Sequence, residues 1–175
     1  MKKITSKILS DEHQNILKII EILECKCDLL GQEEINKEFF EKVIRFIRNY
    51  ADKFHHAKEE DILFKEFNKC AEEGCVHCNP VEQMLLEHEL GRGFVKGMED
   101  GLREGNKKKL TENAGGYCQL LREHILKEDS ILYPMADEAL SQNTQKSMGK
   151  KFKKVESKMK TEKEKCLNLL KSIKT

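Results

Sequence analysis

Two ten-residue segments of this chain carry histidine and glutamate at the same spacing. The first reads His55-His-Ala-Lys-Glu59-Glu-Asp-Ile-Leu-Phe64, and the second reads His124-Ile-Leu-Lys-Glu128-Asp-Ser-Ile-Leu-Tyr133, followed by Pro134. In each copy the His and the Glu are four residues apart, so both lie on one face of a helix. Imidazole nitrogen and carboxylate oxygen are ligands for iron, manganese and zinc. The repeat therefore predicts a buried site that binds two metal ions.

Four helical segments with a 3.6-residue apolar period must position this site. The first is predicted to begin after Ser10, a good N-cap, and the second carries apolar residues from Phe40 to Ile62. The third runs from about Val81 to Leu102, and the fourth from about Leu110 until it stops near Pro134. Because segments of similar length are joined by short loops, we expect an all-α fold, an antiparallel up-down four-helix bundle.

A fifth helical segment begins after Ser141, a plausible N-cap, and is mostly polar through Lys165. Its few apolar positions, Met148, Phe152, Val155 and Met159, could lie on the outside of the bundle. We expect residues 1–140 to form the metal-binding bundle. Residues 141–175 are expected to form a C-terminal helical extension packed on or near it.

The composition excludes several classes of protein. The 32 basic and 31 acidic residues leave a net charge of +1, so no overall field steers the molecule toward nucleic acid. The mean hydropathy is −0.65, and no stretch approaches the roughly 18 apolar residues of a membrane span. The first residues have no apolar run behind them, so we expect no signal peptide. We expect a cytoplasmic protein, monomer or homodimer, without nucleic-acid or membrane partners.

The second helix contains adjacent histidines, and periodicity distinguishes them. Steps of four residues lead from Ala51 to His55 and on to Glu59, along the apolar stripe. His56 falls about 100° further around the helix, so we place it on the flank as a neighbour. On this reading, replacing His55 should remove metal and replacing His56 should not.

Two further histidines lie in apolar stripes, so that each of the four helices sends one His into the core. The predicted metal ligands are His13, His55, Glu59, His88, His124 and Glu128. Two bridging carboxylates, the imidazoles, an oxo or hydroxo bridge and exchangeable ligands could complete two roughly octahedral ions. A ferritin-like di-iron enzyme would instead need Glu-x-x-His motifs, and none occurs at an inward His.

These motifs resemble the hemerythrin family, in its branch of cation-binding domains with HHE-type motifs. The matching pieces are His13, the two repeat segments, and Met-Leu-Leu-Glu-His88-Glu-Leu-Gly-Arg, over roughly residues 8–140. The resemblance implies a four-helix bundle with a non-haem di-iron centre, which means two iron ions as cofactor. It matches the same six residues to the family's ligands, although zinc or manganese is chemically possible.

The chain departs from the oxygen-carrying hemerythrins at the third helix. Those carriers have two histidines four residues apart there, whereas His88 is flanked at that spacing by Met84 and Arg92. Tyr50 or His56 could fill the missing position. The resemblance with this departure favours a protein that handles or senses oxygen, peroxide or nitric oxide, and it leaves open whether the protein is an enzyme. The alternative is iron storage, or an iron- or oxygen-responsive binding module without catalysis.

Between the second and third helices lies a loop with three of the seven cysteines. Cys75 and Cys78 form C-x-x-C around His77, and Cys70 precedes them. This spacing is compatible with an exposed loop of free thiols, with a redox pair, or with a second metal site.

Overall fold

The computed structural model describes residues 3–30 and 34–173, whose helices form five continuous rods. The rods are α1 (Ile4–Leu29); α2 (Lys37–Phe46), η1 (Ile47–His56), η2 (Glu59–Leu63) and α3 (Phe64–Glu72); α4 (Val81–Glu104); α5 (Lys107–Lys127), η3 (Glu128–Leu132) and α6 (Tyr133–Ala139); and α7 (Gln142–Ser172). The η segments are π-helical. These ranges contain no strand, and no helix in them combines the length and apolarity of a membrane span.

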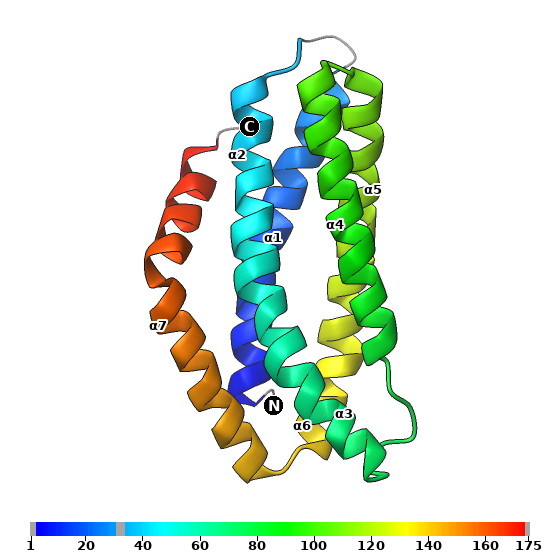
Figure 1. The fold of residues 1–175 in the computed structure, drawn as a ribbon, viewed down its shortest axis with the longest axis vertical. Helices are drawn as coiled ribbons and strands as arrows, with labels where there is room; N and C mark the ends of the chain where they lie inside the picture. The colour runs from blue at the N-terminus through cyan, green and yellow to red at the C-terminus, as the bar shows by residue number, and fades with distance from the viewer. Residues whose placement is uncertain (1–2, 31–33, 174–175) are drawn as a thin grey trace.

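The first four rods form an antiparallel up-down bundle, and α7 lies along its outside (Figure 1). The chain rises through α1, descends from α2 to α3, rises through α4 and descends from α5 to α6. Helix α7 then runs back up against α1 and the second rod, with Met148 and Phe152 buried. The all-α bundle with an additional C-terminal helix is therefore confirmed.

Side-chain caps define where several helices begin. Asn36 accepts a hydrogen bond from the backbone N–H of Phe39 at 3.0 Å, and Asn106 and Ser141 do the same at the starts of α5 and α7. Gly105 ends α4 in the left-handed region at φ 66°, which glycine adopts without strain. A tight turn then returns the chain as α5 alongside α4.

Two predicted helix boundaries are wrong. Ser10 is inside α1, which begins six residues earlier, at Ile4, and its hydroxyl donates to Asp129 instead of capping the helix. The fourth rod does not stop at Pro134 but continues to Ala139. Pro134 is tolerated because it falls in the first turn of α6, immediately after the π-helical segment η3, where its missing N–H is least costly.

The core has three layers along the bundle axis. One apolar cluster includes Ile20, Phe40 and Leu110, and a second, nearer α3 and α6, includes Phe67 and Leu132. The histidines and glutamates of the predicted site lie in the stretches of chain between these clusters. The bundle thus places its polar layer where apolar packing closes it on both sides.

Candidate metal centre

Seven buried side chains from four rods come together in the polar layer. One group that could hold a metal ion consists of His56, Glu59, His88 and His124, and a second consists of His13, His55, Glu59 and Glu128. Within each group the candidate ligand atoms lie within 4.8 Å of one another. Glu59 belongs to both groups, and Glu128 Oε2 lies 3.3 Å from Nε2 of both His13 and His124. All six predicted residues are therefore brought together, and His56 joins them.

His56 lies in the centre, not on the helix flank where the 3.6-residue pattern places it. Its side chain is 6% exposed, and its ring stacks on that of His88 with centroids 3.8 Å apart. The physical reason is the π-helical form of η1, in which i→i+5 hydrogen bonds put one residue more into each turn than an α-helix has. The wider turn brings His55 and His56 to the inner face together.

Each of the five imidazoles has a carboxylate at its Nδ1 side. The pairs are His55 with Glu12 (2.9 Å), His88 with Glu60 (2.7 Å), His124 with Glu87 (2.8 Å), His13 with Asp129 (3.2 Å) and, more loosely, His56 with Asp52 (3.8 Å). A carboxylate only accepts, so a hydrogen-bonded Nδ1 carries the proton and Nε2 keeps its lone pair. Proteins orient metal-binding histidines in this way.

Basic side chains hold these carboxylates in turn. Lys58 donates to Glu12, and Lys127 donates to Glu87. The Arg92 guanidinium donates to Asp52 at 2.9 Å and to Glu60 at 2.7 Å. The support for the imidazoles is therefore a charged framework around the centre.

Atoms that face the centre are poorly satisfied by protein alone. Within the described part of the chain, His55 Nε2, Glu59 Oε2 and both Glu128 oxygens have no hydrogen-bond partner. His88 and His124 direct their Nε2 atoms at each other over 3.0 Å, although each has a carboxylate at Nδ1. Each buried unsatisfied group costs about 1–3 kcal/mol. Cations on the Nε2 side would satisfy all of them.

The spacing of these atoms also suits metal ions. Bonds of about 2.1 Å put neighbouring ligands of an octahedral ion about 3 Å apart. The separations from His55 Nε2 and His88 Nε2 to Glu59 Oε2 are 3.5 and 3.6 Å. The donor set thus fits two cations with small adjustments of the side chains.

The charge balance of the polar layer calls for cations as well. Burial, together with the adjacent Glu128, raises the pKa of Glu59 well above its usual range. Burial and the surrounding imidazoles lower the pKa of His55 far below its usual value, and that of His56 to about 3. His55 and His56 are therefore neutral at pH 7, and ionising Glu59 beside Glu128 is costly without a cation.

Comparison with known families agrees with this geometry. A family model described as the hemerythrin HHE cation binding domain matches residues 5–136, well over half of the chain. The chain belongs to the hemerythrin HHE family. The match includes every residue of the centre, and α7 lies outside it. Neither the curated proteins nor the solved structures that were compared gives a match.

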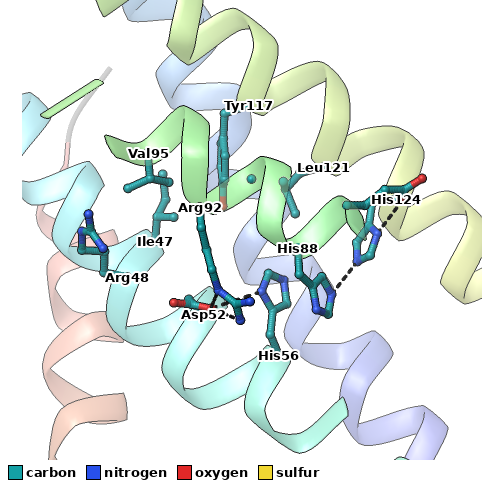
Figure 2. Close-up of a pocket in the computed structure, with 12 residues that line it drawn as sticks. Ile47, Arg48, Asp52, His56, His88, Arg92, Val95, Tyr117, Leu121 and His124 are labelled. Atoms are coloured by element: carbon teal, nitrogen blue, oxygen red, sulfur yellow. Dashed lines mark hydrogen bonds and ion pairs between the residues drawn. The ribbon is translucent and has the colours of Figure 1, made fainter. Parts of the chain in front are cut away.

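Helix α4 brings one histidine, His88, to the centre of this hemerythrin-like chain. Met84 is buried in an apolar cluster, and Arg92 is engaged with Asp52 and Glu60. His56 instead faces His88, with His124 beside them (Figure 2). One of the two groups that could hold a metal ion thus contains three imidazoles, and the other contains two, those of His13 and His55.

A small cavity adjoins the three-histidine group. It has a free volume of about 20 Å³, enough for one water-sized molecule, and its walls include Val95, Tyr117 and Leu121 (Figure 2). The Tyr117 hydroxyl is buried and has no hydrogen-bond partner among the described residues. The cavity admits only a very small guest beside the centre.

Tyr133, rather than Tyr50, is the tyrosine at the centre. Asn15 donates to the Tyr50 hydroxyl at 2.9 Å, and the Tyr50 ring stacks on Phe46 in the apolar core. Tyr133 donates to Glu59 and lies 3.3 Å from His13 Nε2. The sequence placed Tyr133 at the end of the second repeat, but periodicity gave no sign of this contact.

The cysteine loop is separate from the centre. Cys75 and Cys78 are exposed, and neither metal-capable group found in the described residues contains a cysteine. Cys70 is buried, and burial together with a side-chain hydrogen bond to Cys75 raises its pKa to about 11. These observations favour free thiols over a second metal site.

Proposed function

We propose that this chain is a cytoplasmic di-iron protein that handles or senses oxygen, peroxide or nitric oxide. His56, His88 and His124 would hold one ion, His13 and His55 the other, and Glu59 and Glu128 would bridge them. The observation that carries the proposal is the convergence of five buried imidazoles, four of them hydrogen-bonded to carboxylates at Nδ1, on two buried carboxylates. The family's cation-binding character supports it.

The chain's own groups would create the conditions for that chemistry. When bound, two iron ions would supply electrons to a small oxidising molecule. Glu59 and Glu128 offset the charge of the ions, and the carboxylates at Nδ1 strengthen the imidazoles as donors. The apolar clusters on either side keep water out, and the cavity beside His88 limits the size of any guest.

Metal loading tests the proposal directly. Metal-free protein is incubated anaerobically with ferrous iron, desalted and analysed, and about two irons per chain are expected from the two ligand groups. Replacing Glu59 with Ala should abolish loading, since both groups share that carboxylate. His77→Ala is the matched control, because His77 is the one histidine outside the centre and should leave loading intact. Folded wild-type protein that takes up no iron contradicts the proposal, and parallel loading with manganese and zinc measures selectivity.

Exposure of the ferrous protein to oxygen, peroxide or nitric oxide separates catalysis from binding. Repeated turnover would indicate an enzyme, and a single reversible spectral change would indicate a sensor or carrier. The alternative of a responsive binding module has one structural argument. Lys58 donates to Glu12 and, at 3.2 Å, to Glu156 of α7, so His55 is linked through hydrogen bonds to the C-terminal helix.

A further inference from the structure

The two copies of the repeat end in different aromatic residues at equivalent places. Phe64 ends the first copy, and its ring stacks on His88 with centroids 5.8 Å apart. Tyr133 ends the second, and its ring stacks on His13 at 5.6 Å. Each ring thus packs against a histidine, and the two histidines belong to different groups of the centre. The difference between them is a single hydroxyl group.

That hydroxyl points at the ligand atoms of the two-histidine group. Tyr133 is fully buried, donates to Glu59 Oε1 and lies 3.3 Å from His13 Nε2. Neighbouring ligands of one ion are expected about 3 Å apart when its bonds are about 2.1 Å long. The phenol oxygen therefore stands at about that separation from His13 Nε2 and is hydrogen-bonded to Glu59, so it already lies beside two expected ligands.

The two groups also differ in their number of imidazoles, and the group with fewer is the one beside Tyr133. His56 adds a third imidazole to His88 and His124, but the equivalent residue of the second copy is Ile125, which offers no donor. Glu128 Oε2 also lies 3.3 Å from His124 Nε2 of the other group, and if Glu128 bridges as Glu59 does, the ion of His13 and His55 would have one protein donor fewer. An octahedral ion held there would then have room for one more protein ligand, and Tyr133 is the neighbouring oxygen donor.

We propose that Tyr133 ligates the ion held by His13 and His55, as a phenolate on ferric iron. This inference rests on the proposed function and assigns the remaining protein ligand of the same centre. Tyrosinate is a known ligand of ferric haem iron. On coordination the bond from oxygen to hydrogen is replaced by one from oxygen to iron, and the proton is released to solvent, as from other ligands that bind deprotonated. A small molecule would have to displace this side chain, which makes the centre a poor reversible carrier.

The test uses the visible spectrum of the iron-loaded full chain. After anaerobic ferrous loading and oxidation with ferricyanide, wild type should show a phenolate-to-iron charge-transfer band and the matching tyrosine vibrations in resonance Raman. Tyr133→Phe should retain its iron and lose both signals. Tyr50→Phe and Tyr117→Phe are matched controls that remove the other two tyrosines of the chain and should keep both signals.

The outcomes distinguish this inference from the proposed function. Two irons per chain without the band in wild type, or a band that survives in Tyr133→Phe, overturns the tyrosine ligand and leaves the di-iron centre standing. Tyr133 is then only a hydrogen-bond donor to Glu59. Failure of wild type to load iron overturns both. If Tyr133→Phe does not fold, wild type labelled with ring-deuterated tyrosine, together with the two control variants, still decides whether Tyr133 is the ligand.

Discussion

The two repeat copies build the same supporting framework around their histidines. Lys58 donates to Glu12, which accepts from His55, and Lys127 donates to Glu87, which accepts from His124. The acidic residue that follows the inward Glu in each copy contacts a histidine of another rod, Glu60 contacting His88 and Asp129 contacting His13. Each copy therefore supplies one carboxylate and supports for two histidines, and the first copy supplies two imidazoles where the second supplies one.

The copies differ in what covers them. Lys58 is fully buried beneath α7, with its Nζ 3.9 Å from the Phe54 ring centroid and 3.2 Å from Glu156. The side chain of Lys127 remains 30% exposed. The first copy also has His56 where the second has Ile125. The first copy is thus the closed one and supplies two histidines, His55 and His56, whereas the second copy is more open and supplies one, His124.

Making the first copy resemble the second should have the largest effect. His56→Ile removes one of three imidazoles from the group with His88 and His124. Because changing only an outer partner of a ligand costs about 10–100-fold in metal affinity, iron content after desalting should fall from about two to about one per chain. The measurement is metal analysis of the loaded protein, with His77→Ala as control. Retention of both irons at wild-type affinity would show that His56 is not a ligand and has only a structural role.

The sequence predicted which side chains come together because its signal is local. The spacing of four residues between His and Glu, and the apolar stripes around His13 and His88, depend only on helical geometry. They predicted six residues that the structure does bring together, and the bundle that positions them.

His56 was placed on the helix flank and Tyr133 was missed, for different physical reasons. A π-helical turn changes the period itself, so counting at 3.6 residues put His56 on the wrong face. Tyr133 reaches Glu59 across the bundle, a contact between residues 74 positions apart that no local pattern encodes. The repeat did contain signs of the supporting framework, because Lys58 matches Lys127 and Glu60 matches Asp129, and such charged residues have no role in an apolar stripe.

The difference in burial predicts unequal stability effects for the two lysines. Lys58→Met leaves Glu12 and Glu156 without their buried ammonium partner, and breaking a buried pair costs about 3–5 kcal/mol. Lys127→Met should cost at most about 1 kcal/mol, since that pair is partly solvated. Urea unfolding of the metal-free proteins near pH 8 measures both values. Equal losses would show that α7 does not make the two frameworks different.

The smallest expected effect is a difference in pH dependence between Glu12 and Glu87. Burial raises the pKa of Glu12 to about 7 despite Lys58, whereas burial of Glu87 is outweighed by hydrogen bonds from His124 and Lys127, which lower its pKa to about 2. A raised carboxyl pKa means that the folded state holds more protons, so the contribution of Glu12 is favourable below about pH 4.5 and is lost as pH rises through about 7. The lowered pKa of Glu87 gives a contribution that is present above about pH 4.5 and lost only as pH falls toward 2.

The two glutamine variants of the metal-free protein test this contrast. Between about pH 5.5 and about pH 8 the wild type should lose about 2 kcal/mol of stability through Glu12, and Glu12→Gln should remove that slope. Glu87→Gln should instead lower stability by a constant amount over the same range, because Glu87 stays ionised throughout it. Urea unfolding at several pH values gives both curves. Parallel curves for Glu12→Gln and wild type would mean that Glu12 stays ionised over this pH range. Lys58 would then offset the burial of Glu12 as fully as Lys127 offsets the burial of Glu87.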